Sequence, residues 1–118
     1  MGSRIIATVF DCRDAEALAA FWCAALGCQV ARRWRDAHGT EYVESDGDPV
    51  LLFHPVTEPK RAKNRVHIDV RAPGLQYDEV ARLVALGGRV VADDQAVPWV
   101  VMQDPEGNEF CVLPPDDG

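Results

Sequence analysis

An internal repeat constrains the fold of this chain more than any other feature of its sequence. The hexapeptide ALGCQV at 25–30 returns as ALGGRV at 85–90, sixty residues later. A chain of 118 residues has the length of one domain. A repeat of this kind marks supersecondary units that cannot bury their apolar faces alone. We therefore expect a single domain over 1–118 that contains two similar modules.

In each half, the repeated hexapeptide ends a helix pattern that follows one β-rich run and precedes three others. The first helix pattern has Asp14 as an N-cap, Glu16 in its first turn and Gly27 after its last turn. Turn sequences such as SDGDP and DPEGN separate the predicted strands. The predicted strands are 4–12, 28–34, 40–45 and 49–54 around a helix at 14–27, then 65–72, 89–91, 98–103 and 109–114 around a helix at 74–88.

This order of elements predicts an α+β fold of two βαβββ modules that form a curved mixed sheet with a shared cleft. Module 1 is expected at about 4–55 and module 2 at about 65–114, with 56–64 as a linker. Each sheet needs a helix on one face and leaves its other face open. The open faces are therefore where any chemistry is expected.

Alternation along the strands separates residues that should pack under the helices from residues that should line the cleft. The cleft side is rich in polar groups: Asp11, His67, Asp69, Glu109 and Cys111. The residues expected to be buried are Ile6, Phe10, Val66, Ile68, Val70, Phe110 and Val112 in the strands, and Leu18, Phe21, Trp22, Ala25, Leu26, Val80, Leu83, Val84 and Leu86 in the helices.

Charge and composition exclude several classes of function. The net charge of −7 argues against a nucleic-acid partner, and the basic sequence PKRAKNR at 59–65 is interpreted as a solvated linker. No apolar run approaches the roughly 18 residues of a membrane span, and the N-terminus lacks a signal-peptide pattern. We therefore expect a cytoplasmic protein. The four cysteines have no CxxC spacing, so a disulfide framework is not expected.

Three segments carry a resemblance to a known family: DCRDAEALAAFWCAALG at 11–27, RVHIDV at 65–70 and WVVMQDPEGNEFCVL at 99–113. With these segments the chain resembles the vicinal oxygen chelate superfamily, which includes glyoxalases, bleomycin-resistance proteins and extradiol dioxygenases, and it is most similar to small glyoxalase-like domains. The resemblance implies two βαβββ modules around a cleft, dimerisation and, in the metal-dependent members, a divalent ion that the substrate chelates.

The resemblance also implies four positions where metal ligands should lie, and two of those positions lack a donor atom. They correspond to Ala7, to Leu51 or Leu52 depending on register, to His67 and to Cys111. Ala7 and the leucines cannot coordinate a metal. Glu109 lies two residues before the last position. His67 and Cys111 can bind Zn²⁺ or a softer metal, and Asp11 or Asp69 are alternatives for a third ligand.

The polar residues each have a second interpretation. His67 and Asp69, about 6 to 7 Å apart along a strand, are an acid/base pair or a polar pair lining a wet cleft. Asp11 is a ligand contact or the ion-pair partner of Arg71. Cys111 is a nucleophile activated by His67 or a residue that lines the cavity.

Two further groups of residues also leave alternatives open. His54 at the end of its strand points into the cleft or into water. Trp34, Tyr42 and Trp99 are walls for a flat ligand or a dimer interface. The sequence does not separate these alternatives.

We predict a glyoxalase-like protein that binds a small organic molecule in the cleft without the full metal site, as in bleomycin-resistance-like sequestration by a homodimer. The net acidity suits a cationic glycopeptide. The alternative is a divalent-metal-dependent lyase, isomerase or dioxygenase with Zn, Ni, Mn or Fe. His67 and Asp69 are the catalytic candidates. The candidate ligand contacts are Asp11, His54, Trp99, Glu109 and Cys111. A third class is a structural or regulatory dimer without a ligand.

Overall fold

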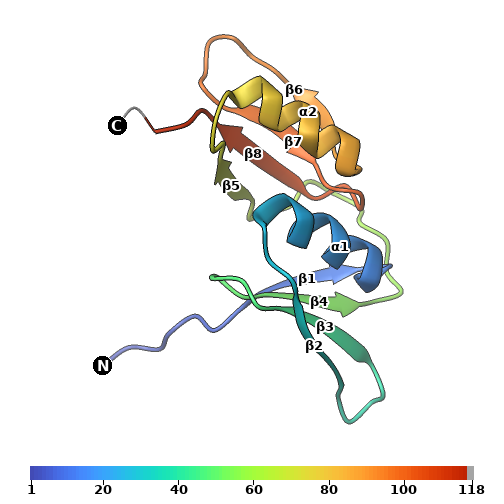
Figure 1. The fold of residues 1–118 in the computed structure, drawn as a ribbon. Coiled ribbons are helices and arrows are strands. Elements are labelled where there is room, and N and C mark those ends of the chain that lie inside the picture. The colour runs from blue at the N-terminus through green and yellow to red at the C-terminus, as the bar shows by residue number, and fades with distance from the viewer. Residues whose placement is uncertain (117–118) are drawn as a thin grey trace. The chain divides into compact units, whose positions relative to one another are not determined.

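The internal repeat corresponds to two copies of one βαβββ module in the computed structural model, which describes residues 1–116. The chain divides into two units, Met1–Pro59 and Lys60–Gly118, and each unit contains one module (Figure 1). The first module consists of β1 (Thr8–Cys12), α1 (Ala15–Leu26), β2 (Val30–Arg35), β3 (Glu41–Ser45) and β4 (Leu51–Pro55). The second consists of β5 (Ile68–Arg71), α2 (Gln76–Leu86), β6 (Arg89–Ala92), β7 (Val100–Gln103) and β8 (Glu109–Leu113).

The two modules have the same topology. Each contains a four-stranded mixed sheet, with strand order β1-β4-β3-β2 in the first module and β5-β8-β7-β6 in the second. In both, the first strand pairs in parallel with the last, and the remaining pairs are antiparallel. The predicted α+β fold of two βαβββ modules is therefore confirmed, with the strands arranged as two separate sheets.

Helix α1 begins and ends where its capping residues predict. The Asp14 carboxylate accepts a hydrogen bond from the Ala17 amide at 3.0 Å, and Gly27 takes a left-handed conformation with φ of 72°. Below the helix, the Trp22 ring stacks on Phe10, with ring centroids 5.6 Å apart, and Phe10 stacks on Phe53. These rings form the centre of the first module's core, because Trp22 and Phe53 are almost wholly buried.

Three of the predicted buried helix residues are exposed instead. Leu26 is 43% exposed because it lies in the last turn of α1, next to the Gly27 cap. Val84 and Leu86 are 46% and 38% exposed. They lie at the two edges of the apolar stripe of α2, whose buried residues are Val80 and Leu83.

The first strand of each module is shorter than predicted. The β1 ladder begins at Thr8, opposite Leu51, and leaves Ile6 75% exposed. The β5 ladder begins at Ile68, opposite Phe110, and leaves Val66 78% exposed. Ile6 and Val66 both precede the first paired residue of their strand, so neither belongs to the ladder.

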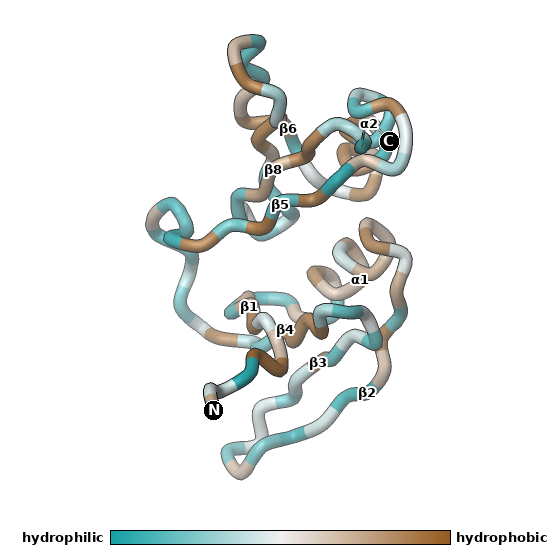
Figure 2. The backbone as a smooth tube through the Cα atoms, turned by 90° about the vertical axis from the view of Figure 1, so that its left-hand side faces the viewer, coloured by the Kyte–Doolittle hydropathy of each residue, from teal (hydrophilic) through white to brown (hydrophobic). Residues whose placement is uncertain are grey.

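The surface composition of the first module differs between its elements. Figure 2 shows the β2–β3 hairpin as largely hydrophilic, in keeping with the pairs that Arg32 makes with Glu44 and Arg35 makes with Glu41. Within the described part of the chain, neither helix is long and apolar enough to cross a membrane.

The N-cap of α1 is the clearest local determinant of stability in the first module. We expect Asp14→Ala to lower the free energy of unfolding by about 1 kcal/mol, because the Ala17 amide loses its acceptor. Urea denaturation followed by circular dichroism measures this loss. Asp14→Asn is the matched control and should retain most of the stability, since asparagine caps as well as aspartate. Equal losses in the two variants would contradict a capping role.

Candidate functional site

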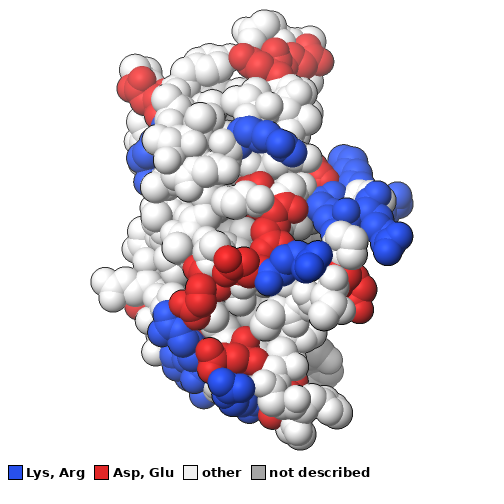
Figure 3. Space-filling view, turned by 90° about the vertical axis from the view of Figure 1, so that its right-hand side faces the viewer, with Lys and Arg blue, Asp and Glu red and all other residues white. Residues whose placement is uncertain are grey.

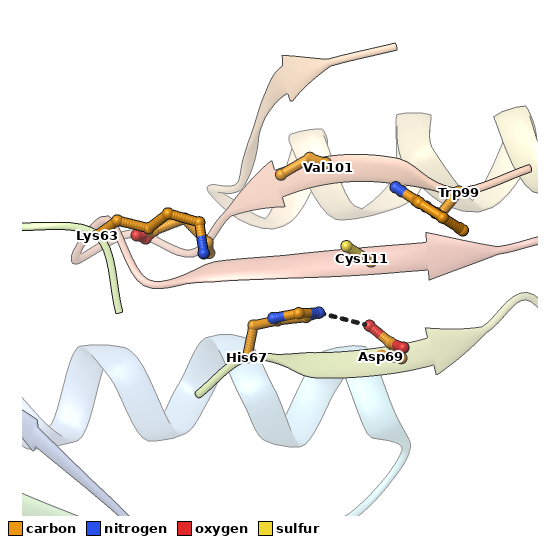
Figure 4. A pocket seen from close by; sticks show the side chains of 7 residues that line it. Lys63, His67, Asp69, Trp99, Val101 and Cys111 are labelled. Atoms are coloured by element: carbon orange, nitrogen blue, oxygen red, sulfur yellow. Dashed lines mark ion pairs between the residues drawn. The ribbon is translucent and has the colours of Figure 1, made fainter. Parts of the chain in front are cut away.

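The candidate site is a pocket in the second module with a volume of about 380 Å³. This volume lies within the range of about 300–1,000 Å³ that is common for small-molecule sites. Figure 4 shows the pocket with its side chains. The residues that line it are Lys63, His67, Asp69, Trp99, Val101, Glu109 and Cys111.

Strand register brings the middle of this pocket together. In the parallel pair of β5 and β8, Asp69 lies opposite Cys111, and in the antiparallel pair of β7 and β8, Val101 lies opposite the same cysteine. Residues in register on adjacent strands point to the same face of the sheet. Asp69, Cys111 and Val101 therefore form one row across three strands.

His67 is the residue just before β5, and its side chain contacts this row. Its Nε2 lies 3.2 Å from Oδ1 of Asp69, so the two side chains are in direct contact (Figure 4). The spacing along an ideal strand had left that contact undecided. The two side chains are 45% and 58% exposed. The histidine lies just outside the regular strand, next to Ile68, the first residue of β5.

Cys111 is the buried member of this group, at 8% exposure. Burial raises the pKa of its thiol, and the charge of Asp69 and a hydrogen bond with that carboxylate raise the pKa further. The Lys63 ammonium acts in the opposite direction. Cys111 is therefore held as a protonated thiol at neutral pH, which disfavours its interpretation as an activated nucleophile.

Glu109 is engaged by partners that the sequence did not reveal. Its carboxylate lies 2.9 Å from Lys60 Nζ and accepts a hydrogen bond from the Asn64 amide at 3.1 Å. Burial opposes ionisation, but the hydrogen bonds from Lys60 and Asn64 outweigh it and lower the pKa of Glu109. The basic segment before β5, interpreted as a linker, therefore forms one end of the pocket through Lys63 and holds Glu109 in place.

The turn between β7 and β8 positions the start of β8. Buried Asp104 accepts hydrogen bonds from the amides of Glu106 and Asn108 at 2.9 and 3.0 Å. Gly107 takes a positive φ of 87° within this turn, a conformation that favours glycine. The DPEGN sequence thus fixes where Glu109 and Cys111 enter the sheet.

Trp99 supplies the apolar wall of the pocket. It lies just before β7 rather than on a strand and is 42% exposed. Trp34 and Tyr42, grouped with it from the sequence, stack on each other in the first module with ring centroids 4.3 Å apart. Of these three aromatic residues, only Trp99 lines the pocket.

Asp11 and His54 meet each other in the first module. Their strands pair with Asp11 opposite His54, and the His54 Nδ1 lies 3.0 Å from Asp11 Oδ1. The His54 ring also stacks on Tyr42. Within the second module, Arg71 pairs with Asp116 at 3.1 Å. The alternative in which Asp11 pairs with Arg71 would join the two modules, and it stays a prediction.

The donor set tests whether a metal fits. At the positions implied by the resemblance, Ala7 precedes β1, Leu51 is in the core, and neither it nor Leu52 has a donor atom. His67, Asp69 and Cys111 each offer one donor atom, and these atoms lie within 4.8 Å of one another. An imidazole, a carboxylate and a thiolate suit Zn²⁺ and similar transition metals, so these three residues fit a metal although the four-position set does not.

Comparisons with known proteins agree with this architecture. The sequence model of a protein family described as glyoxalase-like domain matches residues 7–113. A search of curated proteins found no significant sequence match.

Similar folds occur among solved structures. FosX, a fosfomycin resistance protein of Listeria monocytogenes complexed with Mn(II) and 1S,2S-dihydroxypropylphosphonic acid, has a TM-score of 0.76 at 14% identity, over 96% of this chain and 93% of that one. The trypanothione-dependent glyoxalase I of Leishmania major has a TM-score of 0.71 at 16% identity, over 96% of this chain and 87% of that one. A glyoxalase/bleomycin resistance protein/dioxygenase family enzyme of Burkholderia phytofirmans has a TM-score of 0.69 at 16% identity, over 92% of this chain and 96% of that one.

At these identities the solved structures share the fold with this chain, and the family match rests on the sequence itself. That match extends from the residue before β1 to the last residue of β8, so it includes both modules. The chain therefore belongs to the glyoxalase-like domain family, within the vicinal oxygen chelate superfamily.

Proposed function

We propose that this protein binds a small organic molecule in the pocket of its second module. The observation that carries the proposal is the combination of an apolar wall, Trp99 and Val101, with the polar group of His67, Asp69 and Cys111 in one pocket of about 380 Å³. Ligand sites commonly combine a mainly apolar lining with a few polar groups that orient the ligand. The indole face suits a flat or ring-containing group, and His67 and Asp69 are exposed enough to contact its polar atoms.

Reversible binding is favoured over covalent chemistry because the Cys111 thiol is protonated. A thiol whose pKa is raised contributes little thiolate at neutral pH, and thiolate is the nucleophilic form. Two candidate functions therefore follow. The first is binding without chemistry, as in sequestration. The second is metal-dependent catalysis, which does not require a cysteine nucleophile.

The protonation of Cys111 can be measured directly. We expect its reaction with iodoacetamide, followed by peptide mass spectrometry, to be slow at pH 7 and still accelerating above about pH 8.5, the pKa of an ordinary thiol. Asp69→Asn should speed the reaction several-fold at pH 7, because the carboxylate raises the thiol pKa. Asp11→Asn, in the first module, is the matched control and should have no effect. A fast reaction at pH 7 in the wild type would overturn the assignment of a protonated thiol.

Ligand binding can be tested by a thermal-shift screen of glycopeptides and small diols. A true ligand at about 100 times its Kd should stabilise the protein by about 2.7 kcal/mol and raise its melting temperature. Trp99→Ala should abolish the shift, because the pocket loses its wall. Trp34→Ala removes a tryptophan of the first module and should keep the shift. Binding that survives Trp99→Ala would place the ligand elsewhere and contradict the proposal.

The second candidate function, a metal-dependent lyase, isomerase or dioxygenase, is favoured by the 4.8 Å grouping of donor atoms from His67, Asp69 and Cys111. When bound there, a divalent ion would supply Lewis-acid polarisation of substrate oxygens. His67 and Asp69 would then coordinate the ion at the pocket that they line. Three protein ligands with an open position are the usual arrangement of a catalytic zinc site.

Zinc binding separates the two candidates. If the second holds, calorimetric titration should give one Zn²⁺ per chain, and Zn²⁺ should protect Cys111 from iodoacetamide, since the same sulfur binds both. His67→Ala should weaken zinc binding by more than the roughly 10–100-fold typical of losing a residue that only hydrogen-bonds to a metal ligand. His54→Ala is the control, because this histidine lies in the first module and contacts Asp11. Absence of binding to the wild-type protein would eliminate the metal-dependent candidate.

A further inference from the structure

The second module has a larger, more open pocket, with a volume of about 600 Å³, that shares residues with the His67 pocket. Its lining is basic: Lys60, Arg61 and Lys63 come from the segment before β5, and Arg89 comes from β6. Glu106 and Glu109 also line it. Four cationic and two anionic side chains leave a local charge of +2, in a chain whose net charge is −7.

Most of these cations are not neutralised by carboxylates. Several arginines outside this pocket form ion pairs with carboxylates, for example Arg33 with Glu16 at 2.7 Å and Arg82 with Glu79 at 2.8 Å. Within residues 1–116, Arg61, Lys63 and Arg89 have no such ion pair. Figure 3 shows the difference: blue and red side chains lie interleaved over the lower part of this face, whereas a dense group of Lys and Arg side chains stands at its right edge.

The contacts of the individual cations leave donors available. Within residues 1–116, the only hydrogen bond of Lys63 Nζ goes to the Asn64 carbonyl, at 3.4 Å, which is a long hydrogen bond. Arg89 Nε donates to the Gln103 side chain at 2.8 Å, which orients the guanidinium and leaves its terminal nitrogens without a described acceptor. Lys60 is the exception, since it neutralises Glu109 at 2.9 Å and donates to the Ala62 carbonyl. Glu109 therefore does not cancel the charge of the other three.

We infer that this basic pocket binds an oxyanion, a phosphate or carboxylate group, belonging to a ligand whose organic part occupies the adjoining His67 pocket. Guanidinium groups match such groups geometrically, because they present parallel N–H donors to two oxygens. The two pockets share Lys63, Val101 and Glu109, so one molecule can occupy both. The inference that one ligand occupies both pockets rests on the proposed function, whereas the inference of an anion pocket does not.

The inference reverses the expectation from net charge. An acidic chain suggests a cationic ligand, but the field at a pocket depends on the nearest charges, because exposed charges more than a Debye length away, about 8 Å at physiological salt, are largely screened. Lys63 lines the His67 pocket as well as the basic pocket. The net charge of the side chains that line the basic pocket is positive.

Inorganic phosphate tests the anion pocket. Titration at constant ionic strength, followed by ³¹P NMR, should show saturable binding to the wild-type protein. The double variant Arg61→Gln/Arg89→Gln should bind at least about tenfold more weakly, since hydrogen bonds to charged groups are each worth about that factor. The control is Arg4→Gln/Arg65→Gln, which also removes two exposed arginines and gives the same net charge, yet lies outside the pocket lining. Equal weakening in both double variants, or no saturable binding, would overturn the anion pocket.

Phenyl phosphate tests the connection between the pockets. It should bind at least several-fold more tightly than inorganic phosphate, because its ring reaches Trp99, and Trp99→Ala should remove this gain while leaving phosphate binding unchanged. Equal affinities for the two probes would overturn the shared ligand. Neutral diols do not need the anion pocket, so their failure to bind bears on the proposed function alone.

Discussion

The parallel pairing of β5 with β8 is the constraint on which the candidate site depends. This ladder sets Asp69 beside Cys111, and the next ladder sets Val101 on the other side of the same cysteine. A slip of one residue along either ladder would turn these side chains to the helix-covered face, since strand side chains alternate with a period of two. The ladder is in turn held by burial, because Phe110 and Val112 on the opposite face of β8 are at most 1% exposed.

The two modules repeat a topology but differ in what they present on their open faces. In the first module, Trp34, Tyr42 and His54 stack across three strands, and Asp11 completes the row. In the second, the equivalent region carries a histidine, a carboxylate and a thiol around a pocket. A repeat in sequence therefore predicts the backbone of both modules, whereas the chemistry depends on side chains that the repeat does not share.

Charge in the second module is organised locally. Lys60 neutralises Glu109, which also accepts a hydrogen bond from the Asn64 amide, while Arg61, Lys63 and Arg89 retain unpaired charge within the described chain. A carboxylate held in this way keeps its ionised form and positions the segment before β5. The same segment thereby serves both the pocket with His67 and the basic pocket beside it. These relations connect residues about 45 positions apart, such as Asn64 and Glu109, and no local pattern in the sequence indicates them.

The sequence by itself determined the elements, because caps, turns and apolar periodicity are local: Asp14 and Gly27 delimit α1, and DPEGN separates β7 from β8. It also placed His67, Asp69 and Cys111 on one face through alternation. Tertiary structure decided the partners, since they depend on strand register and on where the irregular segments lie. It paired Asp11 with His54, brought His67 into contact with Asp69, and placed the basic segment before β5 against Glu109. The contacts of Asp11 with His54 and of Lys60 with Glu109 form only when distant segments meet, so their physical cause is in the folded chain rather than in any short stretch of it.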